Sequence, residues 1–249
     1  LTPRQRQRMN TMAEILAAAR RQLRACEEFN IRSVAAEIGL SSQGLYRYVD
    51  SIDQLRFLVT QQIVDSMLAF MGRACARYSD PDERIVAAAV AFRTWALHNP
   101  IEFRHAFTAP RSAPGGGDQD AVYTPQRVGS FFAPLFVELR GRLSFAVPTE
   151  LDPTFDPTQA IELIGPQYPP LAGTDAATMV WMFQYCWARL YGIVALEAFQ
   201  QIDPAYTKSG LFFTVTLREI AGRLKIADLS SLERVFYAES DPLPTQSAT

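Results

Sequence analysis

Residues 29–55 read FNIRSVAAEIGLSSQGLYRYVDSIDQL, and this stretch decides the fold. Asn30 can cap a helix, because its side-chain oxygen can accept a hydrogen bond from an N–H group of the first turn. Apolar residues then recur at positions 31, 34, 35 and 38, the spacing of one buried helical face. Gly39 can end this helix sharply, because glycine adopts a left-handed conformation without steric cost. We therefore predict a short helix followed by a tight turn.

A second short helix follows the turn. Ser41 is its expected cap, and a helix of barely two turns over residues 42–48 would point Leu45 and Val49 inward. The remaining side chains of this helix are left to face outward: Ser42, Gln43, Tyr46, Arg47 and Tyr48.

The outward-facing set has the chemistry that DNA reading needs. The major groove admits a helix, arginine can pair with a guanine edge, and glutamine with an adenine edge. Tyrosine hydroxyls and helix N-termini can hold phosphates. Two short helices around a glycine also occur in ordinary all-α proteins, so the geometry alone leaves that alternative open.

The segment ILAAARRQL…IRSVAAEIGLSSQGLYRYVDSIDQL resembles the N-terminal DNA-binding domain of TetR/AcrR-type transcriptional regulators. The family pattern IA…GVS…LYxYF…SKxxL corresponds here to VA…GLS…LYRYV…SIDQL. Two departures weaken the electrostatic part of the match. Ile52 replaces the lysine that usually meets a phosphate, and the run Cys26-Glu27-Glu28 replaces a glycine before the second helix.

The resemblance implies a helix-turn-helix domain and assigns roles to its exposed residues. We expect base-edge contacts from three side chains of the second short helix, Ser42, Gln43 and Arg47. Phosphate contacts are expected from Tyr46, Tyr48 and the Gly44 backbone, with Arg32 reaching the groove from the preceding helix.

Composition sets the class of protein. The chain has 249 residues, 48% hydrophobic and 20% charged, which is enough to bury a core in one or two domains. Residues 1–60 hold nine arginines and six acidic residues, a net +3, which leaves −5 for the rest of a chain of formal net charge −2. The positive charge is therefore gathered at the end that would face phosphates.

Targeting signals and cysteine usage indicate a cytoplasmic protein. No apolar run is long enough to span a membrane, and no signal peptide is visible. The three cysteines, Cys26, Cys75 and Cys186, lie far apart and lack metal-binding spacing, so we expect reduced, buried thiols.

Periodicity along the chain predicts an all-α protein. The resemblance implies two domains, a three-helix helix-turn-helix domain at residues 1–52 and a helical effector-binding and dimerisation domain at residues 53–240. Residues 241–249 are expected to form a disordered tail. Six prolines within 147–173 predict an irregular arm. The expected helices span residues 3–28, 31–38, 42–48, 52–78, 81–99, 101–108, 124–145, 175–202, 207–226 and 230–238.

Catalysis and metal binding find little support in the sequence. The only histidines, His98 and His105, are separated by the helix-breaking Pro100, and no hydrolase, phosphate-loop or zinc motif occurs. We therefore expect no catalytic residue, no metal and no cofactor.

Aromatic residues are concentrated in the predicted second domain. Rings with a few polar groups can line a site for an apolar small molecule, although filling a core is the commoner role of any single ring. The resemblance implies an effector site in the C-terminal helices, and WALHNPIEFRHAF…WARLYGIVALEAF looks like a C-terminal subtype with a Trp-x-x-x-x-Gly motif (Trp187 to Gly192). The residues expected near this pocket are Trp95, His98, Phe103, Phe107, Tyr185 and Tyr191.

The last two long helices suit self-association. Small residues recur on one side of the first, which permits close helix approach, and an apolar seam runs along the second. The resemblance implies a two-fold dimer through a four-helix bundle. The interface candidates are Ala188, Gly192, Ala195, Phe213, Leu217 and Ile220.

The sequence therefore favours a dimeric, ligand-responsive transcriptional repressor that releases a DNA operator when a small apolar or aromatic effector binds. An alternative stays open. The chain could be a helical small-molecule binding protein or enzyme whose helix-turn-helix is a relic or contacts a protein partner.

Overall fold

The computed structural model describes residues 2–108, 124–142, 162, 165–173, 175–226 and 234–235. Every element among these residues is helical, which confirms the all-α prediction. The glycine-rich loop, most of the proline-rich arm, most of the helix expected at 230–238 and the tail at 241–249 lie outside the described residues. The α-helices are α1 (Pro3–Cys26), α2 (Ile31–Glu37), α3 (Ser42–Leu45), α4 (Ile52–Cys75), α5 (Pro81–His98), α6 (Pro100–Thr108), α7 (Thr124–Glu138), α9 (Ala176–Ala198), α10 (Pro204–Ser209) and α11 (Leu211–Arg223).

The chain divides into two compact units. Unit 1 comprises Leu1–Ser66 and Asn99–Pro125, and unit 2 comprises Met67–His98 and Gln126–Thr249. The helix α4 begins in unit 1 and ends in unit 2. The short helix α6 belongs to unit 1, although it directly follows α5 of unit 2 in the sequence. The predicted domain boundary after residue 52 stays a prediction.

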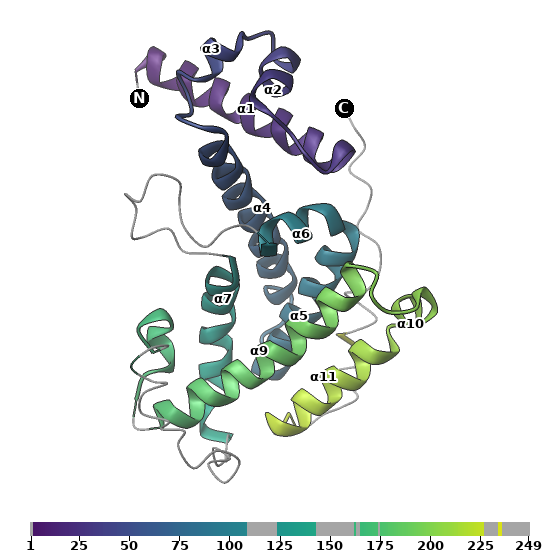
Figure 1. The fold of residues 1–249 in the computed structure, drawn as a ribbon. Coiled ribbons are helices and arrows are strands. Elements are labelled where there is room, and N and C mark those ends of the chain that lie inside the picture. The colour runs from purple at the N-terminus through teal and green to yellow at the C-terminus, as the bar shows by residue number, and fades with distance from the viewer. Residues whose placement is uncertain are drawn as a thin grey trace. The chain divides into compact units, whose positions relative to one another are not determined.

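Unit 1 is a small bundle in which α1 packs against α2 and α6, and α2 packs against α3 (Figure 1). Its core is formed by apolar side chains that are almost completely buried, among them Ile15, Val34, Leu45, Val49 and Leu55. The helix α1 begins with a capping box, because Thr2 Oγ1 accepts from the Gln5 N–H and Gln5 Oε1 accepts from the Thr2 N–H.

Unit 2 is built around α5, which is buried on nearly all sides from Ile85 to Ala96. A helix that is apolar all round must be enclosed by others, and α9 packs against both α5 and α11. The helices α9 and α11 lie side by side and run in opposite directions (Figure 1). A buried ion pair joins α5 to α9, with Arg93 Nε 2.6 Å from Glu197 Oε2.

The C-terminal helices differ from the expected single helix at 207–226. The chain forms α10 and then α11, and Gly210 separates them with φ +65°. Asp203 begins α10 by accepting a hydrogen bond from the Ala205 N–H at 2.8 Å. A left-handed glycine ends one helix and lets the next leave in a new direction.

Three 3-10 turns complete unit 2: η1 (Arg140–Arg142), η2 (Gly165–Gln167) and η3 (Pro169–Leu171). No helix among the described residues combines the length and the apolar character that a membrane crossing requires.

Candidate nucleic-acid interface

The α2–turn–α3 motif forms through the caps that the sequence indicates. The Ser33 N–H donates to Asn30 Oδ1 at 2.9 Å and begins α2. Gly39 ends the helix with φ +71°, and the Gly44 N–H donates to Ser41 Oγ at 3.0 Å to begin α3. Both predicted caps and the glycine turn are confirmed.

The helix α3 is shorter than the predicted span of residues 42–48. Regular helix ends at Leu45 and continues as a turn, in which the Tyr48 and Val49 N–H groups donate to the Leu45 carbonyl at 2.9 and 3.3 Å. Leu45 and Val49 remain buried. The turn therefore keeps residues 46–48 close to the path that a longer helix would follow.

The residues expected to read DNA lie at the surface of unit 1. Gln43 and Arg47 are exposed, and no hydrogen bond or ion pair engages either side chain within the described part of the chain. Tyr46 is 50% exposed, whereas Ser42 and Tyr48 are half-buried. Arg32 is exposed on α2. The Gly44 amide already donates to Ser41, so a phosphate would have to share it.

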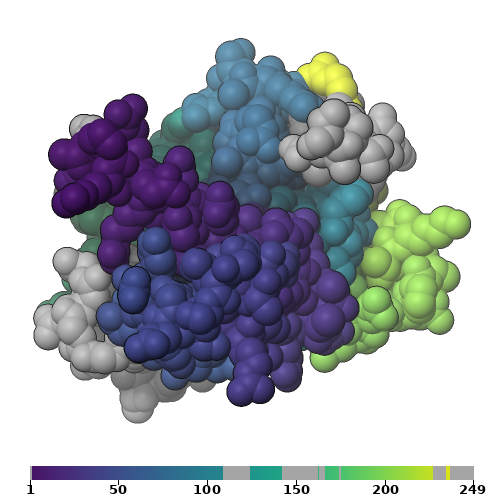
Figure 2. Space-filling view, turned by 90° about the horizontal axis from the view of Figure 1, so that it is seen from above, coloured from purple at the N-terminus to yellow at the C-terminus, as the bar shows by residue number. Residues whose placement is uncertain are grey.

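Arginine pairing divides the positive charge of unit 1 into two groups. Four arginines of residues 1–60 form ion pairs with carboxylates: Arg20, Arg21, Arg24 and Arg56. The other five are exposed and form no ion pair with any described carboxylate: Arg4, Arg6, Arg8, Arg32 and Arg47. These five lie on the first turns of α1 and along α2–α3, the purple and blue elements in the foreground of Figure 2. Their charge is therefore left to act on an external anion.

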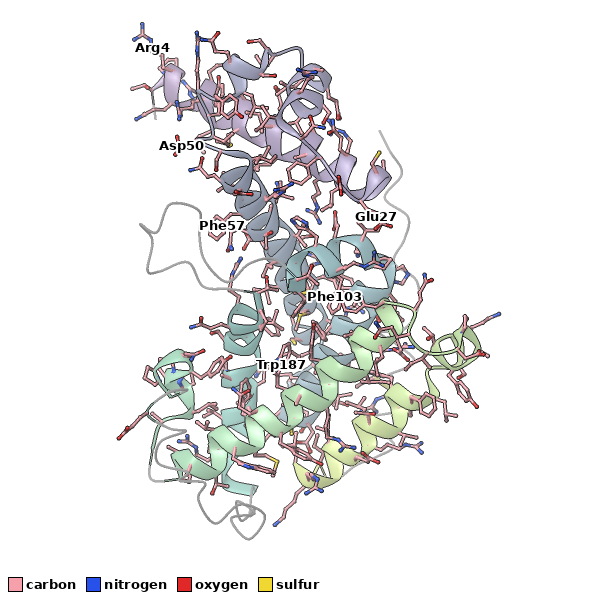
Figure 3. The ribbon with its side chains drawn as sticks, viewed as in Figure 1. Arg4, Glu27, Asp50, Phe57, Phe103 and Trp187 are labelled. Carbon is pink, nitrogen blue, oxygen red and sulfur yellow. The ribbon has the colours of Figure 1, made fainter. Side chains whose placement is uncertain are left out.

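The start of α1 contacts the turn that follows α3. The Arg8 guanidinium lies 5.4 Å from the centre of the Tyr48 ring, a cation–π contact. Arg4 projects from the first turn of the same helix (Figure 3). The sequence did not indicate the contact between Arg8 and Tyr48, because forty residues separate them.

The six residues expected near an effector pocket lie in two places. Phe103 and Phe107 belong to α6 of unit 1, with ring centroids 4.5 Å apart. Trp95 is buried on α5, and His98 Nδ1 lies 2.7 Å from the Thr94 carbonyl oxygen.

The two tyrosines of this set are on α9. Tyr185 stacks on Trp181 with centroids 5.2 Å apart, and the Arg223 guanidinium lies over its ring at 4.8 Å. Tyr191 stacks on Trp187, and burial raises the pKa of its hydroxyl above the ordinary value.

A different set of residues lines an apolar cavity in unit 2. The cavity has a volume of about 50 Å³ and lies between α5, α7, α9 and α11. Its wall includes Val86, Phe136, Phe183, Cys186, Leu190 and Leu217. The six expected pocket residues are not part of this wall. Trp187, which does line it, contacts the rings of Phe92 and Phe132 (Figure 3).

The interface candidates separate by burial. Phe213, Leu217 and Ile220 are at most 7% exposed and face the interior of unit 2, and Ala195 is also buried. Ala188 is exposed, and Gly192 has no atom within 4 Å of the position that a Cβ would take. The opposite side of α11 carries exposed apolar side chains, Leu211, Phe212 and Val215, and Leu196 is exposed on α9.

Within the described part of the chain, no cluster of three or more His, Cys, Asp or Glu side chains is placed to hold a metal ion. Cys75 and Cys186 are buried as expected, whereas the expectation was wrong for Cys26, which is exposed at the end of α1. Burial raises the pKa of the Cys186 thiol to about 12, so this thiol is neutral.

Comparison with known proteins bears on the identity of the chain. Residues 85–220, more than half of the chain, match the family described as "Tetracyclin repressor-like, C-terminal domain". The uncharacterized HTH-type transcriptional regulator Rv0681 of Mycobacterium tuberculosis is 31% identical over 42% of this chain and 45% of its own length. The HTH-type transcriptional regulator Mb1846 of Mycobacterium bovis is 30% identical over 48% of this chain and 53% of its own length. The chain thus spans about half the length of these curated relatives.

A solved structure shares the fold. The crystal structure of SCO4313, described as a regulatory protein, superposes with a TM-score of 0.62 and 23% identity, covering 89% of this chain and all of that one. The helix-turn-helix geometry, the helical second unit and the family match agree. The chain belongs to the tetracycline-repressor-like (TetR) family of helix-turn-helix transcriptional regulators.

Proposed function

We propose that this protein is a DNA-binding transcriptional regulator that reads a near-palindromic operator as a dimer. The observation that carries the proposal is the division of side chains on α3 and its following turn. Leu45 and Val49 are buried, whereas Gln43 and Arg47 are exposed and make no hydrogen bond or ion pair with any described residue. Such a helix can enter the major groove and present its polar side chains to base edges.

The roles follow from position. Gln43 and Arg47 contact base edges, and Ser42 supports them from the first turn. Tyr46, Tyr48 and the shared Gly44 amide hold phosphates and fix the register. Arg32 approaches the backbone from α2. The unpaired arginines at the start of α1 add to the sequence-independent attraction.

Dimerisation is proposed to use the outer sides of α9 and α11. Leu211, Phe212 and Val215 are 41–50% exposed and occupy one side of α11. Gly192 on α9 leaves open space beside it, which permits close approach of a second helix. Ala188 lies on the same helix as Gly192. The family resemblance implies that α9 and α11 form a four-helix bundle with the same two helices of a second protomer. The dimer would place two recognition helices about 34–36 Å apart.

The effector site is proposed to be in unit 2. The apolar cavity between α5, α7, α9 and α11 favours an apolar molecule, and Trp95, His98, Tyr185 and Tyr191 lie on two of the same helices, α5 and α9. Phe103 and Phe107 lie on α6. Because α4 belongs to both units, a shift of this helix could carry the signal. A coupling of about 1–3 kcal/mol would change operator affinity about 5–150-fold.

The protein is proposed to act in the cytoplasm by binding rather than by turnover. The test is a gel shift of the full chain on the DNA upstream of its own coding region. We expect retardation by the wild type and a loss of about 1–3 kcal/mol in operator affinity for Arg47→Ala.

The matched control is Arg21→Ala, because Arg21 is an exposed arginine that pairs with Glu37 rather than facing the proposed groove. Equal binding by wild type and Arg47→Ala would reject the assigned role. Failure of the wild type to retard any upstream fragment would favour the alternative of a binding protein with a relic helix-turn-helix.

A further inference from the structure

The cavity in unit 2 selects for molecules without hydrogen-bonding groups. Its lining presents apolar surface, and the thiol of Cys186 is neutral because burial raises its pKa to about 12. A polar ligand atom placed there would lose its water without gaining a partner, which is costly. The chemistry therefore fits a compact hydrocarbon or an unsubstituted aromatic ring.

The volume of the cavity sets a second condition. At about 50 Å³ it is far smaller than the cavity of roughly 150 Å³ that accommodates benzene in a protein core. A ligand larger than a few atoms can therefore be fully buried there only if part of the wall moves. Most of the wall consists of side chains on four α-helices, whose packing resists displacement.

One part of the wall is backed by a short irregular segment instead. Phe183 and Phe136 both line the cavity, with ring centroids 5.6 Å apart. The Tyr168 ring lies against Phe183, with centroids 5.0 Å apart, and is only 6% exposed. Tyr168 lies between the 3-10 turns η2 and η3, in a segment at residues 165–173 that we call the strap.

The strap is held at two points. Arg140 Nη2 donates to the carbonyl oxygens of Leu171 and Ala172 at 3.0 and 2.9 Å. Tyr168 fits a seat on α7 that exists only because residue 129 is glycine. A Cβ at Gly129 would lie 2.6 Å from the Tyr168 hydroxyl oxygen and 2.7 Å from a ring carbon.

We propose that the strap is a movable support behind the Phe183 side of this cavity, and that an apolar ligand without hydrogen-bonding groups is admitted when Tyr168 leaves its seat beside Gly129. The inference rests on the proposed function in that it takes the cavity as the effector site. It assigns the strap a role in ligand admission and retention. It also predicts that changes at the seat act on the cavity without touching any helix of unit 1.

The experiment measures access to the cavity through Cys186, which lines it. The full-length protein is treated with benzyl methanethiosulfonate, a neutral apolar thiol reagent, and labelling of each cysteine is followed by peptide mass spectrometry. Cys75 is the internal control, because it is buried in unit 2 outside the cavity wall. Benzene is the ligand probe and should slow the labelling of Cys186 in the wild type.

Two variants act on the strap from opposite sides. Tyr168→Ala removes the ring, and Gly129→Ala fills the seat. Each should raise the labelling rate of Cys186, and Tyr168→Ala should raise it by about tenfold or more. The labelling rate of Cys75 should stay unchanged in both variants. The matched control is Gly72→Ala, the same substitution in α4, where the added Cβ would meet only a Phe131 ring carbon at 3.9 Å. Should Tyr168→Ala fail to fold, Gly129→Ala carries the test.

Wild-type labelling rates in both strap variants would overturn the inference, and so would a parallel rise at Cys75, which would indicate general loosening. No protection by benzene in the wild type would also count against it. Gel shifts on the same preparations separate the two hypotheses. If the strap variants bind DNA normally and their Cys186 labelling is unchanged, the proposed role of the strap is rejected, whereas the proposed function is not. A wild type that never binds DNA rejects the proposed function and leaves the labelling result standing.

Discussion

Arg20 on α1 and Glu102 on α6 form a two-pronged ion pair inside unit 1. Arg20 Nε lies 2.6 Å from Glu102 Oε1, and Nη2 lies 2.8 Å from Oε2. Arg24 adds a third contact at 2.9 Å, and the Glu102 side chain is only 1% exposed. The pair therefore fixes α6 against the first helix of the helix-turn-helix.

We expect Glu102→Gln to destabilise unit 1. The substitution removes the carboxylate charge that pairs with a largely buried Arg20, and breaking a buried pair costs about 3–5 kcal/mol. Urea unfolding followed by far-ultraviolet circular dichroism measures the change.

The control is Glu27→Gln, which breaks a pair between the same two helices. Glu27 and Arg104 are 60% and 47% exposed, so the loss should stay below about 1 kcal/mol. Equal effects of the two substitutions would contradict the assigned difference between the buried and the exposed pair.

His105 should make stability depend on pH near neutrality. Burial lowers the pKa of His105 below its ordinary value of 6.5, although the Arg56 backbone partly opposes the shift. Its Nε2 is buried without a hydrogen-bond partner among the described residues. The unfolded chain therefore takes up a proton at a higher pH than the folded ring does. The contribution of His105 is complete above about pH 6.5 and is lost as the pH falls toward the lowered value.

Unfolding free energies measured from pH 7.5 to pH 5.5 test this expectation. His105→Phe should remove a pH slope of at most about 1.4 kcal/mol per pH unit, the limit for one proton. His98→Gln is the control and should keep the slope, because it leaves His105 in place. A slope that survives His105→Phe would assign the pH dependence to other groups.

The unpaired arginines should set the salt dependence of DNA binding. Arg32 is exposed on α2 and pairs with no described carboxylate, so it is available to a phosphate. Arg32→Ala should reduce the slope of log K against log salt by about one per protomer. Arg21→Ala should leave the slope nearly unchanged, because Glu37 already neutralises that arginine. Fluorescence anisotropy titrations at several salt concentrations compare the two, and identical slopes would remove Arg32 from the interface.

Local rules were sufficient to predict the helix-turn-helix from the sequence. Asn30, Gly39 and Ser41 act through neighbours within four residues, so their cap and turn roles are visible in the sequence. The burial of Leu45 and Val49 follows from the same short-range spacing.

Features that depend on distant contacts were not predictable in this way. The left-handed Gly210 divides the segment expected to form one helix at 207–226, and its position alone does not show that the chain changes direction there. The seat for Tyr168 depends on Gly129, a residue 39 positions away on another element. An apolar stripe in the sequence does not show whether it packs into the core of its own protomer or against a partner. In the structure, the seam that contains Phe213 and Leu217 faces inward.

Because the seam at Phe213 and Leu217 faces inward, the dimer contact is proposed on the other side of α11. A substitution at Val215 tests this proposal most directly. Val215 is 45% exposed and lies near Phe212, which contacts the Tyr206 ring at 4.8 Å. We expect Val215→Asp to shift the protein toward monomer. A two-fold axis repeats the substitution, so two buried carboxylates would weaken association by about 4 kcal/mol if each removes about 2 kcal/mol.

Sedimentation velocity across a concentration series measures the shift in the monomer–dimer equilibrium. Lys208→Glu changes the charge of the neighbouring α10 but leaves the apolar side of α11 intact, so this control should remain dimeric. A Val215→Asp protein that sediments as the wild type does would place the interface elsewhere. If it becomes monomeric, it should also lose most of its affinity for the full operator, because one recognition helix reads only half of a palindrome.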